Sequence, residues 1–183
     1  MEDKILSTLI AKGYKGTDKL SIQSFSVATI SNLHDKQALL GADFNFVLLS
    51  PSTTALVSFG LDKIKSFAEG VGVSIGGSAG IDAGFIKRAH DAGLLVHGYT
   101  FSKTGTTAAD EYARFFGWGL DGVFSNHSDL AITARDAFGT AQISEPGTSA
   151  LMGLGLAATA GLADGVIAYE GGWPGADTFA SCE

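Results

Sequence analysis

Short apolar runs alternate with amphipathic stretches along residues 3–138 of the chain. The apolar runs have the length of strands, and in the stretches between them apolar side chains recur at helical spacing. The pattern predicts five strands, at residues 20–25, 45–49, 72–75, 94–100 and 122–125. Helices are expected at residues 3–11, 26–40, 82–93, 107–118 and 128–138, and another is expected to end near Gly70.

The expected helix starts carry residue types that accept hydrogen bonds from the free N–H groups of a first turn. These residues are Ser26, Asp82, Thr107 and Ser128. Regular alternation of strands and helices implies parallel strands, because each helix returns the chain across the sheet. The expected fold class is therefore α/β, with helices covering a parallel sheet.

Five parallel strands fit either an open doubly wound sheet or part of a closed β/α barrel, and the pattern alone does not choose between them. A complete barrel typically needs about 250 residues, whereas this chain has 183. No further repeat beyond the strand–helix unit is evident.

The distribution of charge predicts a boundary near residue 139. Every Lys and Arg lies at or before Arg135, and residues 139–149 are rich in Gly, Ser and Thr. We expect a β/α domain over residues 1–139 and a Gly-rich apolar tail over residues 140–183. The net charge of −7 argues against sequence-independent nucleic-acid binding. The single cysteine excludes a disulfide framework, and the charged first residues show no signal-peptide pattern.

In either fold, ligands bind where parallel strands end. Side chains alternate between the two faces of a strand. If Ile22 and Val96 face the helices, four side chains point into the barrel: Gln23, Phe25, His97 and Tyr99. An amide, an imidazole and two aromatic rings at a barrel mouth suit a small polar ligand. Gln23 is equally suited to bond backbone or water in the core, and His97 is better interpreted as a core histidine than as a catalyst.

The remaining histidines and Asp121 give weaker signals. His34 and His90 fall on helices and are interpreted as solvated surface residues. His127 follows the last strand but has no partner at metal-ligand spacing. Asp121 precedes the last strand and so lies at the N-terminal end of the strands. Residues at that end of a β/α barrel stabilise the fold, and Asp121 is given no catalytic role.

A glycine-rich loop precedes the helix that starts at Asp82. Gly76, Gly77 and Gly80 could offer backbone N–H groups to a phosphate. Their spacing matches neither the dinucleotide-binding nor the P-loop fingerprint, which favours a plain loop. Carboxylates do not cluster at strand ends, so the residues of this chain do not assemble a full catalytic set.

Three stretches together resemble the glycerophosphodiester phosphodiesterases. They are Lys-Leu-Ser-Ile-Gln-Ser-Phe at 19–25, Leu-Leu-Val-His-Gly-Tyr-Thr-Phe at 94–101 and Gly-Leu-Asp-Gly-Val-Phe-Ser-Asn at 119–126. The family's strands read roughly Q-S-F, V-H-P-Y-T and G-V-D-G-V-F-T-D, in this order. Gly13-Tyr14 is similar to the bacterial periplasmic members, and Ile75-Gly76 to the family's I-G-P strand end. The resemblance covers residues 4–138, and Gly98 and Gly77 replace two of the family's prolines.

The resemblance implies a partial TIM-type (β/α)8 barrel in which this chain supplies the last five strand–helix units. Family members hydrolyse glycerophosphodiesters to glycerol 3-phosphate and an alcohol with a divalent cation, Ca²⁺ or Mg²⁺. Their metal carboxylates and catalytic histidines lie on the first three strands and an early hairpin, which would precede Met1. We therefore expect no catalytic residue and no metal ligand in this chain, whereas Gln23, Phe25 and Tyr99 would line the substrate pocket.

The tail has a resemblance of its own. Ser144-Glu145-Pro146 and the uncharged run 147–163 are similar to a PEP-CTERM sorting tail, without its terminal basic cluster. A sorting or weakly membrane-associated segment and a periplasmic or exported bacterial protein are the corresponding expectations. The alternative is a helix packed on the barrel or a loose tail.

Two other functions remain open at this point. One is a catalytically inert barrel fragment, and the other is a module that binds a phosphorylated ligand through the 76–80 loop. As part of an open barrel, the outer strands 20–25 and 122–125 would present unpaired edges, so self-association of the isolated chain is expected.

Overall fold

The computed structural model describes residues 2–16 and 20–143. Its sheet has five parallel strands in sequence order: β1 (Ser21–Ser24), β2 (Asn45–Ser50), β3 (Gly70–Ser74), β4 (Leu95–Phe101) and β5 (Gly122–Ser125). The helices are α1 (Glu2–Ala11), α2 (Val27–Leu39), α3 (Thr53–Phe59), α4 (Leu61–Lys65), α5 (Ala83–Asp91), α6 (Thr106–Gly117) and α7 (Ser128–Ile143).

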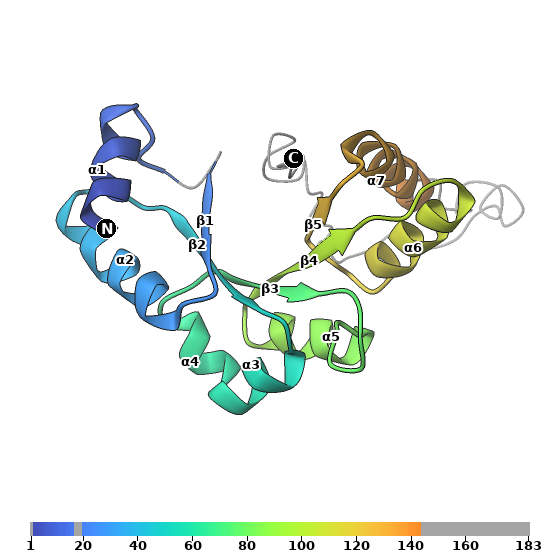
Figure 1. The fold of residues 1–183 in the computed structure, drawn as a ribbon, viewed down its shortest axis with the longest axis horizontal. Coiled ribbons are helices and arrows are strands. Elements are labelled where there is room, and N and C mark those ends of the chain that lie inside the picture. Colours follow the sequence, from blue (N-terminus) through green and yellow to red (C-terminus); the bar gives the residue numbers. More distant parts are fainter. Residues whose placement is uncertain (1, 17–19, 144–183) are drawn as a thin grey trace, which may run out of the picture.

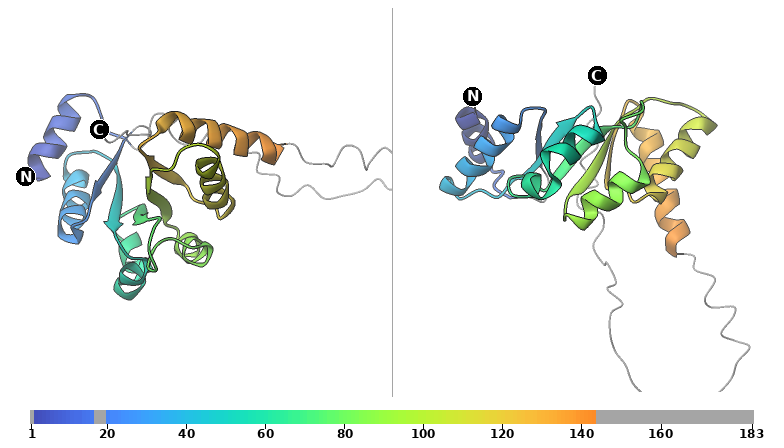
Figure 2. Two further views of the ribbon diagram at one scale, coloured as in Figure 1. Left: turned by 45° about the vertical axis from the view of Figure 1, so that its right-hand side comes forward. Right: turned by 90° about the horizontal axis from the view of Figure 1, so that it is seen from below.

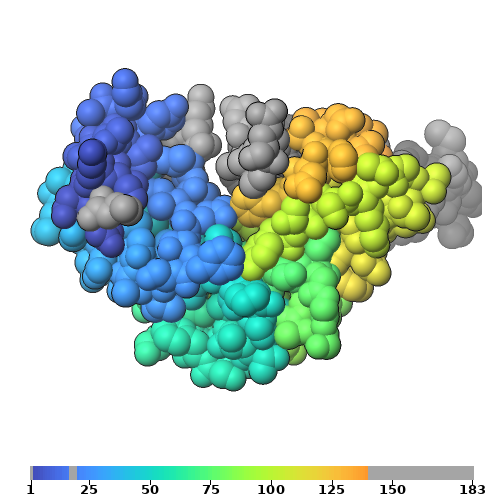
Figure 3. Space-filling model, viewed as in Figure 1, coloured from blue at the N-terminus to red at the C-terminus, as the bar shows by residue number. Residues whose placement is uncertain are grey.

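The sheet is curled, and the helices lie outside the curve (Figures 1 and 2). In the space-filling view, the N-terminal residues form one flank and the segments of α6 and α7 the other, with the segments of α3–α5 joining them below (Figure 3). The predicted α/β class with parallel strands is confirmed, and the curl identifies the sheet as part of a barrel rather than an open sheet.

Two predicted helix starts are confirmed by their caps. The Ser26 hydroxyl accepts the Thr29 N–H at 3.1 Å, and the Asp82 carboxylate accepts the Phe85 N–H at 2.6 Å. The prediction for Thr107 was wrong, because α6 already begins at Thr106 and the Thr107 hydroxyl donates to the Thr104 carbonyl instead.

The connection between β2 and β3 differs from the single helix that the pattern predicts. It contains two short helices, α3 and α4, separated by Gly60 at a φ of 103°. Glycine reaches this φ without strain, so the chain turns there between α3 and α4. Helix α4 ends at Lys65, before the predicted helix end near Gly70. Strand β3 begins at Gly70, two residues before its predicted start at residue 72.

The core lies between the sheet and the helices. Leu48, Val71 and Val96 are buried on the convex face of the sheet, together with Phe85 of α5 and Phe115 of α6. Fully burying one such side chain stabilises the fold by about 1.5–3 kcal/mol. Ile22 also packs against this cluster, so the assumption that Ile22 and Val96 face the helices is confirmed.

Carboxylates secure the ends at which the strands begin. The Phe46 N–H donates to Glu69 Oε2 at 2.6 Å, and the Val96 N–H donates to Asp121 Oδ2 at 2.7 Å. The acceptor in each pair immediately precedes the next strand, and its own N–H donates back to the carbonyl of Phe46 or Val96. These reciprocal bonds fix neighbouring strands in register at the end opposite the ligand-binding edge.

Helix α7 continues to Ile143, past the expected domain boundary at residue 139. The sorting-tail resemblance falls on residues 144–163, which lie outside the described residues, as does the remainder of the tail. Within the described ranges, no helix combines the length and apolar character that a membrane span requires.

Candidate functional site

The concave face of the sheet is built in layers. In one layer, Leu49 of β2 and His97 of β4 alternate with Gly72 of β3 and Gly122 of β5. A Cβ at Gly122 would lie 2.7 Å from His97 Cδ2, and one at Gly72 would overlap Leu49 Cδ2. Large side chains from alternate strands thus cover glycines on the strands between them, the arrangement expected inside a β/α barrel.

His97 lies on this concave face and is mostly buried. Its ring centre is 6.1 Å from that of Phe124 on β5. Burial lowers the pKa of His97 below its ordinary value, and the Asp121 carboxylate opposes this only in part. The imidazole is therefore neutral at neutral pH, which fits the interpretation of His97 as a core residue.

Phe25 and Tyr99 meet although their strands are not neighbours. Phe25 follows β1 and Tyr99 lies on β4, yet their ring centres are 6.0 Å apart in an edge-to-face arrangement at 80°. Phe25 is 62% exposed. The curl of the sheet brings these two rings together across the concave side, a contact that an open flat sheet would not allow.

The Tyr99 hydroxyl is buried and has no hydrogen-bond partner among the described residues. Burial raises the pKa of Tyr99, so the phenol stays protonated and can donate a hydrogen bond. A buried polar atom without a partner carries a desolvation cost of about 1–3 kcal/mol. Such an atom is a reason to look for a ligand or a further polar group at this point.

Gln23 lies two residues before Phe25, in register with Val47 of β2, and is partly exposed. The three predicted pocket residues, Gln23, Phe25 and Tyr99, therefore share the concave side of the sheet near its C-terminal edge.

The register shift between Gly98 and Phe101 turns Phe101 towards the helices, where it stacks on Tyr112.

The glycine-rich loop after β3 is closed by its own hydrogen bonds. The Gly76 N–H donates to the Ser74 hydroxyl, the Gly80 N–H donates to the Gly77 carbonyl, and the Ile81 N–H donates to the Ser74 carbonyl. A Cβ at Gly80 would come within 2.6 Å of the Gly76 carbonyl oxygen, so close packing within the loop requires a glycine there. Two of the three candidate phosphate donors, the N–H groups of Gly76 and Gly80, are thus engaged within the loop, which does not favour the alternative of a phosphate-binding module.

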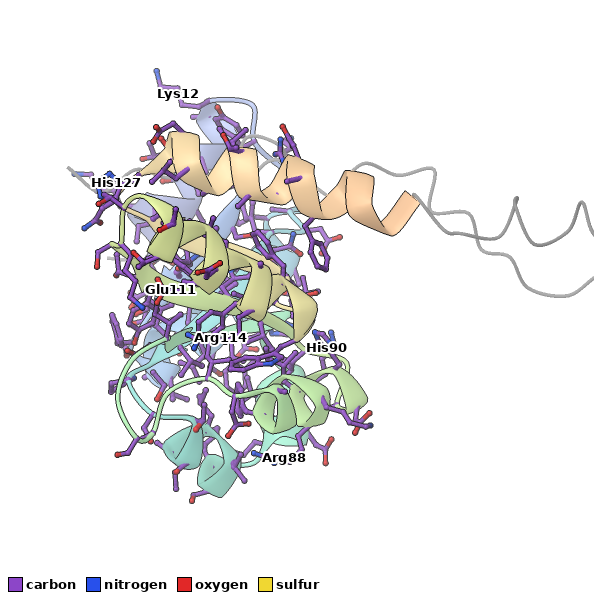
Figure 4. All side chains as sticks on the ribbon, turned by 90° about the vertical axis from the view of Figure 1, so that its right-hand side faces the viewer. Lys12, Arg88, His90, Glu111, Arg114 and His127 are labelled. Carbon is purple, nitrogen blue, oxygen red and sulfur yellow. The ribbon has the colours of Figure 1, made fainter. Side chains whose placement is uncertain are left out.

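His34 and His90 are partly exposed on helices, as expected, and each also contacts a carboxylate. His90 Nε2 lies 2.8 Å from Asp121 Oδ2, and His34 lies 3.3 Å from the Asp35 carboxylate. Figure 4 places His90 and His127 towards opposite sides of the molecule, with His127 where α7 begins. The His127 N–H donates to the Ser125 hydroxyl, which also bonds the Tyr112 phenol at 2.6 Å, so this strand end is held by structural bonds.

Sequence reasoning missed an ion pair between a buried glutamate and a partly exposed lysine. Glu111 on α6 is 8% exposed, and its Oε1 lies 2.8 Å from Lys103 Nζ in the loop after β4. A signal was present, because Glu111 falls on the apolar stripe of α6 with Ala108, Tyr112 and Phe115. Figure 4 shows Glu111 towards the side at which α6 and α7 begin.

The described residues do not fit a divalent cation. Within residues 2–16 and 20–143, no group of three or more His, Cys, Asp or Glu side chains could hold a metal ion. Among the described strands and the loops that follow them, Asp82 is the one carboxylate, and it caps α5.

A curled parallel sheet with helices on its outer side places the chain in the β/α-barrel class of proteins. The model of the Glycerophosphoryl diester phosphodiesterase family matches residues 1–130, and the chain belongs to this family. The resemblance recognised in the sequence motifs is thereby confirmed.

Two relatives illustrate the similarity. The glycerophosphodiester phosphodiesterase of Bacillus subtilis (strain 168) is 27% identical over 134 residues, which are 71% of this chain and 42% of the relative. A crystal structure of a candidate glycerophosphoryl diester phosphodiesterase from Agrobacterium tumefaciens str. C58 has a TM-score of 0.53 and 17% identity. That match covers 73% of this chain and 49% of the solved chain, and it shows a shared fold. The chain thus spans less than half the length of both relatives.

Proposed function

We propose that this chain supplies the substrate-binding side of a metal-dependent glycerophosphodiester phosphodiesterase. The complete enzyme hydrolyses a glycerophosphodiester to glycerol 3-phosphate and an alcohol. Membership of the family supports the reaction class. The contact between Phe25 and Tyr99 across the concave side is the observation that carries the assignment of a binding surface.

Each pocket residue has a role that its chemistry suits. The exposed ring of Phe25 and the edge-on ring of Tyr99 offer apolar surface to the carbon atoms of a small ligand. The unpartnered Tyr99 hydroxyl donates a hydrogen bond to a ligand oxygen. The amide of Gln23 can donate to and accept from the hydroxyl groups of a glycerol moiety.

The proposal assigns the divalent cation, Ca²⁺ or Mg²⁺, to residues outside those described. Hard cations bind clustered carboxylate oxygens, and the described strand ends do not bring carboxylates together. We therefore derive no catalytic step from these residues and assign them substrate binding alone. On this proposal the catalytic groups belong to three further strand–helix units of an eight-stranded barrel.

Binding of glycerophosphocholine to the purified chain tests the proposal. We expect ¹H–¹⁵N NMR shifts on titration that centre on the concave side, with no release of glycerol 3-phosphate in Ca²⁺ or Mg²⁺. Phe25→Ala should weaken binding about tenfold, because it removes half of the aromatic contact surface. Leu39→Ala is the matched control, since Leu39 is also apolar and 86% exposed but lies at the end of α2.

A second variant separates a binding role of Tyr99 from a structural one. Tyr99→Phe removes a buried hydroxyl without a described partner, so the free energy of unfolding should be unchanged or rise by about 1 kcal/mol. Ligand binding should nevertheless weaken. If glycerophosphocholine caused no NMR shifts, or caused the same shifts in Phe25→Ala as in the unmodified chain, the proposal would be contradicted. The alternative of an inert barrel fragment would then be favoured.

A further inference from the structure

Charged side chains are almost absent from the functional edge of the sheet. The strands β1–β5 and the loops that follow each of them contain two charged residues, Asp82 and Lys103. Asp82 is engaged in capping α5 through the Phe85 N–H. Lys103 is therefore the one Lys or Arg side chain at this edge of the described sheet.

Lys103 is held in place by a buried partner. Its Nζ lies 2.8 Å from Glu111 Oε1, and the lysine side chain is 54% exposed whereas the glutamate side chain is 8% exposed. A buried carboxylate needs a partner that compensates its loss of hydration. Glu111 thus ties the β4–α6 loop, which follows Tyr99 by a few residues, to the body of α6.

An ammonium group can donate three hydrogen bonds, and Glu111 Oε1 accounts for one of them. The other two remain available on the exposed side of Lys103. As the one Lys or Arg side chain on the described strand ends and the loops that follow them, Lys103 is the source of positive charge there that an anion would meet.

We infer that Lys103 binds the phosphate group of a glycerophosphodiester and that Glu111 is the residue that positions it. This inference rests on the proposed function, since a glycerophosphodiester is an anion that occupies the C-terminal edge. Lys103 lies outside the three pocket residues that the motif resemblance implies, and it would help to select the ligand by its charge. Phosphodiesters would bind through Lys103, whereas uncharged glycerol ethers would gain nothing from it.

The test compares Lys103→Gln with Lys87→Gln in the full chain, using glycerophosphocholine as the probe in NMR titrations. Lys87 is the matched control, because its Nζ also pairs with a carboxylate at 2.8 Å, that of Asp91, on the exposed surface of α5. Both variants lower the net charge by the same amount. We expect Lys103→Gln to weaken binding about tenfold and Lys87→Gln to leave it unchanged, with Lys103→Arg restoring most of the affinity.

Glu111→Gln separates positioning from simple charge. Removing a carboxylate makes the chain less negative, so a pure charge effect would strengthen anion binding. If Glu111 positions Lys103, binding weakens instead. Stronger binding in Glu111→Gln would overturn the positioning role.

The outcomes distinguish this inference from the proposed function. Wild-type binding that Lys103→Gln leaves unchanged would overturn the role of Lys103 and leave the proposed function standing. An absence of wild-type binding would overturn both. Equal losses in Lys103→Gln and Lys87→Gln would indicate a general charge effect and also refute a specific phosphate contact.

Discussion

At the scale of single residues, the packing of the concave face depends on glycines, whose lack of a side chain leaves room for larger neighbours. Gly122 leaves room for the His97 ring, because a Cβ there would approach His97 Cδ2 to 2.7 Å and Nε2 to 3.0 Å. The imidazole is thereby accommodated within a layer of the barrel interior. Its neutral state follows from the same burial, which lowers the pKa of His97.

Gly122→Ala should destabilise the fold by about 1–3 kcal/mol, because the added methyl group displaces a packed ring. Gly117→Ala is the control, since a Cβ at this position near the end of α6 meets nothing within 4 Å. It should be neutral or stabilising by up to about 1 kcal/mol. Urea unfolding monitored by circular dichroism measures both, and an unaffected Gly122→Ala would contradict the layered packing.

The direction of the concave side chains could be predicted from the sequence, and the ion-pair partner of Glu111 could not. Strand alternation assigned Ile22 and Val96 to the helices, which placed Gln23 and Tyr99 on the opposite face. The apolar stripe of α6 indicates that Glu111 is buried, but its ion pair is with Lys103, which lies in the loop before the helix. A helical pattern cannot show such a contact between elements.

At the scale of elements, the strand–helix order was predictable because each unit carries its own apolar period and end signals. The Ser26 and Asp82 caps are local interactions, and both were recognised. The break at Gly60 was missed, since an isolated glycine is compatible with a continuing helix. Its positive φ, which divides α3 from α4, became evident in the folded chain.

Asp121 shows how one side chain joins two elements. Its Oδ2 accepts the Val96 N–H of β4 and lies 2.8 Å from His90 Nε2 at the end of α5. Asp121→Ala should cost about 1–3 kcal/mol, because it leaves the Val96 N–H without its acceptor. Asp91→Ala, which breaks an exposed pair with Lys87, should cost less than about 1 kcal/mol. Equal midpoints for the two variants in thermal unfolding would argue against this strand-end role.

At the scale of the whole molecule, two strand edges remain unpaired within the described residues. β1 pairs with β2 alone and β5 pairs with β4 alone, while Phe25 and Leu95 are exposed on the concave side. Unpaired edges and exposed apolar surface favour association with another chain. We propose that the isolated chain self-associates through this side.

Light scattering after size exclusion measures this association. We expect a mass above 18.8 kDa that rises with protein concentration. Leu95→Lys should reduce association by placing a charge on the concave face, whereas Leu39→Lys on α2 should not. A monodisperse monomer at all concentrations would contradict the proposal.

The sequence-adjacent pairing of all five strands also has a consequence for the folding pathway. Each unit can add to the one before it through short-range contacts, which favours rapid growth of the sheet. The contact between Phe25 and Tyr99 is different, because it forms only after β2, β3 and β4 have taken up their curvature. The binding surface would then be completed late in folding, after the sheet has curled.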